Sequence, residues 1–179
     1  MASSDHDRGI PLGLVEWFAV EVDQGDAPEL HLVGLQDGDL TRCFDVIQSH
    51  RPRWSDRTFY IDSERVDVTV AQRPDVAELV AAGHASHACI GADGLTVEGA
   101  VLPLVEMFLF RDSVQFFWWP GGEWTAKRVA AFFALLAELL ATAPGSALRP
   151  DPRYPMSARE SLGKSISDVL GAAGSVDFG

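Results

Sequence analysis

Two glutamates interrupt apolar stretches and are the first candidates for chemistry. Glu16 lies in GLVEWFAVEV (residues 13–22), and Glu106 lies in LPLVEMFLF (residues 102–110). If both stretches are strands, each carboxylate shares a face with apolar side chains, which is costly unless the carboxylate is paired. On neighbouring strands the two would be possible buried carboxylates, a pair suited to general acid–base catalysis. The alternative is an ion pair with an arginine, for which Arg65 and Arg111 are candidates.

An aromatic corner is the second candidate site. The stretch VQFFWWPGGEWTAKRV (residues 114–129) places five aromatic residues around a Pro-Gly-Gly turn. We interpret it first as a structural corner, where a buried strand reverses into a helix. Alternation along the strand must turn one of the adjacent tryptophans away from the core. Trp118, Trp119 and Trp124, with the acidic Glu123, are therefore the residues expected to bind a partner, because tryptophan anchors often dominate interfaces.

Other groupings predict no reactive centre. GHASHAC places His84, His87 and Cys89 close together, but a fourth ligand at a typical spacing is missing. SLGKS resembles the end of a phosphate-binding loop, yet Ala158 stands where that loop needs glycine. A nucleophile with its base is not visible. HRPRWSDR is the only basic cluster, and we expect a solvated loop that could also bind an acidic group locally. The sequence thus predicts no catalytic residue, no metal and no cofactor.

The elements that must position these residues follow from apolar spacing and turn residues. Strands are predicted in residues 13–22 and 29–35, as a hairpin, and in residues 58–70, 86–99, 102–110 and 113–120. Helices are predicted in residues 40–50 with Asp39 as N-cap, 74–83, 126–141 with Thr125 as N-cap, and 157–171 with a capping box of Ser157 and Glu160. This order predicts an α+β fold: a mostly antiparallel sheet of about five to seven strands, helices on one face, and a tethered C-terminal helix.

The predicted domain organisation has four parts. Residues 1–12 are expected to be a flexible N-terminus, and residues 13–144 a single α+β domain. Residues 145–156 are proline-rich and predict an extended linker. Residues 157–179 hold the C-terminal helix and a tail. Its four-residue apolar stripe favours docking on its own domain over docking on another molecule.

Bulk composition limits the partners. The 179 residues carry a net charge of −12, which repels phosphate backbones and anionic lipid, so we expect neither nucleic-acid nor membrane binding. The same charge favours a basic protein partner. Two cysteines are too few for a disulfide framework. The N-terminal residues lack the apolar core of a signal peptide, and no apolar run is long enough to span a bilayer. A cytoplasmic protein is expected, and its oligomeric state stays open.

The stretch from LFRDSVQFFWWPGGEWTAKRV to ATAPGS resembles, in layout, the C-terminal half of small bacterial immunity proteins from polymorphic toxin systems. In both, a strand pair ends in an aromatic-Gly-Trp turn, followed by a long helix and a Pro-Gly stop. The resemblance implies a non-enzymatic protein that inhibits one cognate toxin. Two alternatives remain: a small enzyme or ligand-binding domain near Glu16, Glu106, Trp118 and Trp119, and a structural subunit that oligomerises through its C-terminal helix.

Overall fold

The fold is an antiparallel six-stranded sheet with the strand order β10-β1-β9-β8-β5-β2. The computed structural model describes residues 10–19 and 28–171. The strands of this sheet are β1 (Glu29–Val33), β2 (Arg53–Trp54), β5 (Ala88–Asp93), β8 (Val105–Phe110), β9 (Ser113–Trp118) and β10 (Ala147–Pro150). Two small hairpins lie outside it: β3 (Thr58–Ile61) with β4 (Val66–Thr69), and β6 (Thr96–Val97) with β7 (Ala100–Val101). The helices are α1 (Leu12–Ala19), α2 (Asp39–Ser49), α3 (Val76–Ala81), α4 (Ala126–Thr142) and α5 (Met156–Leu170).

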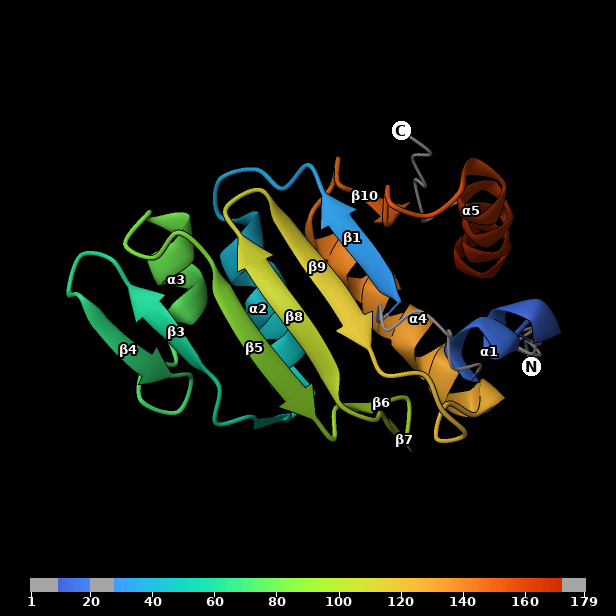
Figure 1. Ribbon diagram of the computed structural model, residues 1–179, viewed down its shortest axis with the longest axis horizontal. Coiled ribbons are helices and arrows are strands. Elements are labelled where there is room, and N and C mark those ends of the chain that lie inside the picture. Colours follow the sequence, from blue (N-terminus) through green and yellow to red (C-terminus); the bar gives the residue numbers. More distant parts are fainter. Residues whose placement is uncertain (1–9, 20–27, 172–179) are drawn as a thin grey trace, which may run out of the picture.

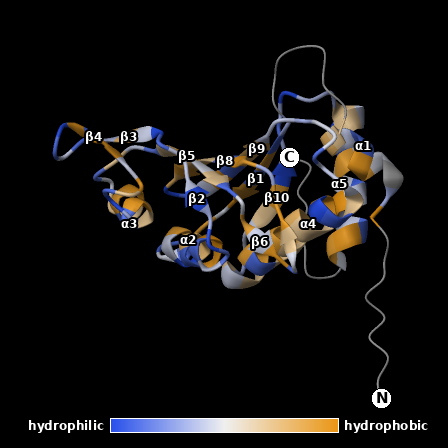
Figure 2. Cartoon of the chain, turned by 90° about the horizontal axis from the view of Figure 1, so that it is seen from below, coloured by the Kyte–Doolittle hydropathy of each residue, from blue (hydrophilic) through white to orange (hydrophobic). Residues whose placement is uncertain are grey.

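The helices α2, α3 and α4 lie together on one side of the sheet, which makes two layers (Figures 1 and 2). The core fills the space between the layers. From α4 it receives Val129, Phe132, Phe133 and Leu136, all at most 1% exposed. These residues recur at the spacing of one helix face, so their burial follows from the sequence pattern. The α+β fold class with a mostly antiparallel sheet is thereby confirmed.

Local signals predicted the C-terminal half of the domain well. The predicted hairpin is formed by β8 and β9, which pair from Val105 with Trp118 to Phe110 with Ser113. The side chain of Thr125 accepts a hydrogen bond from the backbone nitrogen of Arg128 and so caps α4, as expected. The predicted strands around residues 62–64 are β3 and β4.

The first apolar stretch is a helix, which corrects the prediction of a strand. α1 begins after Pro11, whose carbonyl accepts a hydrogen bond of 2.9 Å from the backbone nitrogen of Leu14. Leu14 and Phe18 are buried one helical turn apart, and Phe18 stacks on Trp118 with ring centroids 4.2 Å apart. A short apolar run satisfies either periodicity, so the contacts of Phe18 decide between helix and strand. Residues 20–22 of the predicted strand lie outside the described residues.

Because residues 12–19 form a helix, the predicted hairpin with residues 29–35 does not form, and β1 pairs with other strands. It pairs with β9 on one side and with β10 on the other. Residues 147–150, expected within a linker, therefore form the edge strand of the sheet. Asp39, expected as an N-cap, is the first residue of α2, and its carboxylate accepts a hydrogen bond of 2.7 Å from the backbone nitrogen of Gln36.

The C-terminal helix packs against its own chain. α5 buries Leu162 and Ile166 and contacts α4 and β10. The expected capping box is not formed, since Ser157 makes no cap hydrogen bond and α5 begins at Met156. No helix within residues 10–19 and 28–171 combines the length and the apolarity needed to cross a membrane. The predicted N-terminal flexible segment, apart from residues 10–12, and the tail after residue 171 lie outside the described residues.

Candidate functional site

The candidate site is the face of the sheet that points away from α2, α3 and α4, here called the open face. In the described part of the chain, no helix covers it (Figure 1). Solvent-facing sides of antiparallel sheets are usually polar. The open face instead carries three half-buried phenylalanines at its centre: Phe108 and Phe110 from β8, and Phe117 from β9.

The aromatic residues of the open face contact one another. The ring centroids of Phe108 and Phe117 lie 5.2 Å apart, and those of Phe108 and Phe110 lie 6.2 Å apart. The imidazole of His87 stacks on Phe110 at 5.8 Å. These rings shield one another only in part, since the three phenylalanines are half-buried and His87 is exposed. A partner that covered them would remove further apolar area from water.

An ion pair between Glu106 and Arg57 lies beside the aromatic rings. Glu106 projects from β8 between Gly91 and Phe117 of the adjacent strands, and its side chain is 4% exposed. Nη2 of Arg57 binds its carboxylate, and Nη1 donates to Sγ of Cys89 at 3.6 Å. A carboxylate in such surroundings needs a cation, and the guanidinium supplies it. The Arg57 side chain itself stays 51% exposed.

The segment after β2 brings Arg57 onto the open face by crossing Gly91. The backbone nitrogen of Ser55 donates to the carbonyl of Gly91 at 2.8 Å, and the backbone nitrogen of Gly91 donates to Oγ of Ser55 at 3.1 Å. A Cβ at Gly91 would lie 2.9 Å from Oγ of Ser55. A larger residue at this position would force the Ser55 side chain to shift, so glycine suits this close approach. Burial raises the pKa of the neighbouring Cys89 thiol, although Arg57 opposes this rise.

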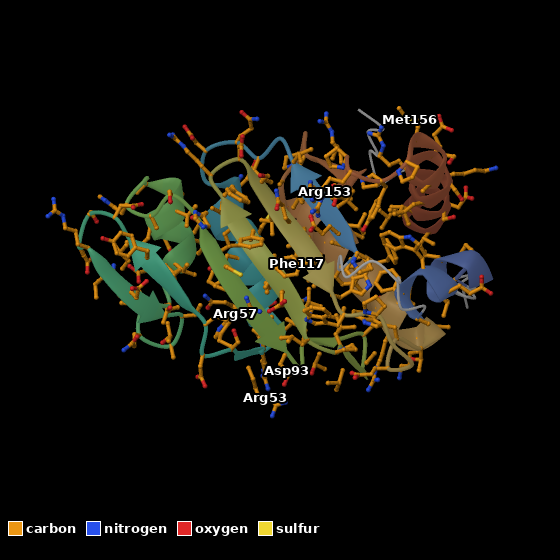
Figure 3. All side chains as sticks on the ribbon, in the orientation of Figure 1. Arg53, Arg57, Asp93, Phe117, Arg153 and Met156 are labelled. Atoms are coloured by element: carbon orange, nitrogen blue, oxygen red, sulfur yellow. The ribbon has the colours of Figure 1, made fainter. Side chains whose placement is uncertain are left out.

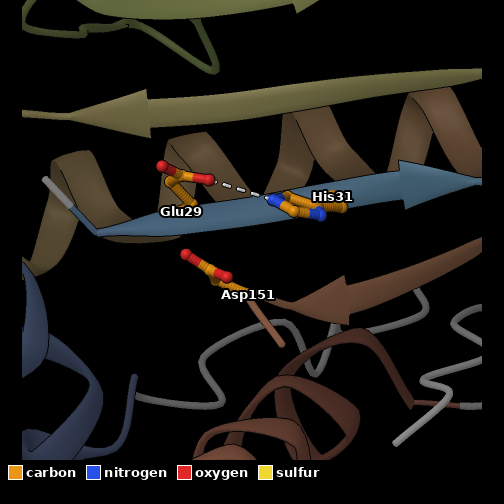
Figure 4. Close-up of side chains that lie close together, drawn as sticks. All are labelled: Glu29, His31 and Asp151. Carbon is orange, nitrogen blue, oxygen red and sulfur yellow. Dashed lines mark hydrogen bonds and ion pairs between the residues drawn. The ribbon is translucent and has the colours of Figure 1, made fainter. Parts of the chain in front are cut away.

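A second cluster lies at the β1–β10 edge of the open face. It contains Glu29, His31 and Asp151, which Figure 4 shows, and Arg153 binds both carboxylates. Nε of Arg153 donates to Asp151 at 2.7 Å, and Nε2 of His31 lies 3.1 Å from Glu29. Burial alone would raise the pKa of Asp151, but the hydrogen bonds from Arg153 outweigh it and lower that pKa. The hydrogen bond to Asp151 in turn raises the pKa of Arg153.

This cluster also offers the residues that could hold a metal ion. The ligand atoms of Glu29, His31 and Asp151 lie within 4.8 Å of one another. Arg153, however, already binds both carboxylates through a single guanidinium. A metal would have to displace it, so the cluster is best described as an arginine bound by two acids.

The aromatic corner is mostly core, which corrects part of the predicted partner surface. Trp118 is 0% and Trp124 is 2% exposed, so neither can contact a partner. Nε1 of Trp124 donates to the carbonyl of Trp119 at 3.1 Å, which closes the Pro-Gly-Gly turn. Trp119 is 60% exposed, and Glu123 is also exposed. Alternation from the buried Trp118 turns Trp119 toward the side of Phe117, at the end of the open face.

The predicted glutamate pair does not form. Glu16 is exposed on α1, which packs through Phe18 on the core side of the sheet, whereas Glu106 projects from the opposite face. The arginine bound to Glu106 is Arg57 and neither Arg65 nor Arg111.

The remaining predicted groups also separate. Both histidines of GHASHAC are exposed, and Cys89 contacts Arg57 instead. The basic cluster HRPRWSDR does bind acids locally: Arg57 pairs with Glu106, and Arg53 pairs with Asp93.

Phe117 and Arg153 were not identified as residues of a site from the sequence. Alternation along β9 places Phe117 on the opposite face from Phe116 and Trp118. The sequence contained this alternation, but it was hard to recognise because the residues on both sides of Phe117 are also apolar. Arg153 was assigned to a linker, and only the pairing of β10 with β1 brings it to the sheet.

Comparison with known proteins gives no relative, because no protein-family profile, curated protein or solved structure matches the chain. The open face is therefore interpreted from its own contacts. It combines half-buried aromatic rings, buried carboxylates, and arginines that remain accessible to solvent.

Proposed function

We propose that the chain is a non-enzymatic binding protein that contacts a protein partner through the open face. The observation that carries this proposal is the set of half-buried phenylalanines on a face that no helix of residues 10–19 and 28–171 covers. Aromatic residues and arginine are enriched in protein interfaces and often dominate their binding energy. A sheet face is also broad, whereas small ligands are usually held in concave sites.

The partner class that we propose is a basic protein, in the specific form of a cognate toxin that this chain inhibits. The net charge of −12 supports it, since opposite charge accelerates encounter. The immunity-protein resemblance around the aromatic corner supports the inhibitor role. Trp119, exposed next to an acidic turn, extends the aromatic surface at one end.

The two alternatives receive less support. An acid–base site would need Glu16 beside Glu106, yet Glu16 lies on α1, which packs on the core side of the sheet, and Glu106 projects from the open face. Oligomerisation through the C-terminal helix would need a free apolar stripe, yet Leu162 and Ile166 are buried against the same chain.

A capture experiment with matched variants tests the proposal. The tagged protein, Phe117→Ser and Val101→Ser are each incubated with lysate of the host at low and at moderate salt. Val101 is the control because it is an apolar residue, 52% exposed, on β7, outside the open face. We expect one stoichiometric basic partner with the unmodified protein and the control, and loss of it with Phe117→Ser. Circular dichroism verifies that both variants fold.

Two results would contradict the proposal. Equal capture by Phe117→Ser and the unmodified protein would remove the open face as the contact surface. A captured partner whose binding does not weaken with salt would remove the electrostatic part.

A further inference from the structure

We propose that Arg57, Phe117 and Arg153 form a recognition row for an acidic segment of the protein partner, in which two carboxylates flank an apolar side chain. The inference rests on the proposed binding role of the open face and specifies the chemistry of the contact. Figure 3 shows Phe117 between Arg57 and Arg153 on the same side of the sheet.

The row follows from the strand register. Glu106 of β8 lies opposite Phe117 of β9, and Phe117 lies opposite Glu29 of β1. Neighbouring strands are about 4.8 Å apart, so the two glutamates are separated by roughly 10 Å across the phenylalanine. Arg57 binds the first glutamate and Arg153 binds the second. The result is an apolar ring with one guanidinium on each side.

The most exposed charges of the row are positive. The side chains of Arg57 and Arg153 are 51% and 60% exposed, whereas the carboxylates of Glu106 and Asp151 are 4% and 3% exposed. Glu29 is 21% exposed. An approaching partner therefore meets mainly the two guanidinium groups, while Glu106 and Asp151 lie beneath them and Glu29 is partly exposed.

Both arginines retain free hydrogen-bond donors. Arginine has five N–H donors. Within the described residues, Nε of Arg57 and Nη1 of Arg153 donate to no acceptor, since the bonds of each guanidinium use its other two nitrogens. Each guanidinium is thus oriented by a buried acid and can still donate to a carboxylate of a partner. Such pre-organisation reduces the ordering cost of binding.

A basic partner and an acidic contact segment are compatible because they act at different ranges. Attraction by the net charge of −12 acts during approach and is screened beyond about 10 Å in salt. The row acts only at contact, where each carboxylate would meet a guanidinium directly. A broad sheet face suits a protein segment, and a free small acid would be held more weakly.

A titration with two small probes tests the row without the partner. Terephthalate carries two carboxylates on opposite ends of a ring, and benzoate carries one. Binding is followed by the NMR signals of the arginine Nε–H groups and the ring of Phe117. If both arginines engage the probe, terephthalate should bind about tenfold more tightly than benzoate, because the second contact is intramolecular.

Variants test whether the preference for terephthalate depends on the two arginines of the row. Arg57→Gln or Arg153→Gln should reduce terephthalate binding to the level of benzoate. Arg53→Gln is the matched control, because Arg53 pairs with Asp93 but is 81% exposed and lies at the sheet edge. It should leave the ratio unchanged. If Arg57→Gln does not fold, Arg57→Lys retains the charge, and we expect it to fold and to lose most of the tenfold preference.

Several results would overturn the inference. Equal affinity for the two probes would do so, as would no saturable shift of the Arg57 and Arg153 signals, or the same loss with Arg53→Gln.

Capture experiments separate the inference from the proposed function. One outcome is that the unmodified protein and the double variant Arg57→Gln/Arg153→Gln capture a partner equally. In that case the proposed recognition by the row is wrong, and the binding role of the protein stands. If the unmodified protein captures none, the binding role fails, and the recognition of a partner segment fails with it, whatever the probes show.

Discussion

Removal of Arg57 should destabilise the protein more than removal of the carboxylate that it binds. Arg57→Ala leaves the Glu106 carboxylate, 4% exposed, without its cation. Glu106→Gln leaves a guanidinium that is 51% exposed and can be hydrated. Removal of the two partners should therefore have unequal effects on stability. The larger loss in unfolding free energy is expected when the charge left behind is the buried one.

The expected magnitude follows from these exposures. Removal of one partner of a fully buried pair costs about 3–5 kcal/mol. Water can enter the space that half-exposed Arg57 vacates, so we expect about 2 kcal/mol for Arg57→Ala, a loss of roughly 4–8 °C in Tm for a chain of this size. Glu106→Gln should cost less than about 1 kcal/mol. Arg53→Ala, whose partner Asp93 is 44% exposed, should cost less than about 0.5 kcal/mol.

Urea unfolding at neutral pH measures all three variants. The fluorescence of the buried tryptophans Trp118 and Trp124 reports the transition. The reasoning is refuted if Glu106→Gln is as destabilising as Arg57→Ala, or if Arg57→Ala is no worse than Arg53→Ala. Either result would mean that the Glu106 carboxylate is well hydrated without Arg57.

Three further predictions use the same measurement. Gly91→Ala should cost about 1–3 kcal/mol, because the added methyl group meets a serine hydroxyl 2.9 Å away. Trp118→Ala should cost about 3–5 kcal/mol and Trp119→Ala less than about 0.5 kcal/mol, since only the first is buried. The lowered pKa of Asp151 adds stability above the ordinary carboxyl pKa, and this part is lost as the pH falls below about 4. The difference in unfolding free energy between the unmodified protein and Asp151→Asn should therefore shrink in acid.

Each of these predictions has a clear contrary outcome. Gly122 is the control for Gly91, because it has open space around its Cβ position. Equal effects of alanine at both positions would show that the close contact of Gly91 with Ser55 does not limit the side chain there. Equal destabilisation by the two tryptophan variants would place both side chains in the core. A difference between the unmodified protein and Asp151→Asn that does not change with pH would show that Arg153 does not lower the pKa of Asp151.

Elements with strong local signals were predictable. The β8–β9 hairpin needs only two apolar runs around Arg111 and Asp112, and α4 needs a capping threonine and one apolar stripe. Residues 13–22 were predicted to form a strand, because a short apolar-rich stretch such as residues 12–19 is compatible with both periods. Its helical state depends on Phe18 stacking on Trp118, a contact between residues that are distant in the chain.

The sequence by itself determined which side chains were available: one of two adjacent tryptophans facing away from the core, a glutamate in an apolar strand, and arginines in two segments expected to be loops. Only the tertiary structure decided how they combine. The row of Glu106, Phe117 and Glu29 exists because β1 lies beside β9, and Arg57 and Arg153 reach it from segments before β3 and after β10. Strand order is set by the packing of the whole core, to which every element contributes, and a local pattern of residue types contains no information about it.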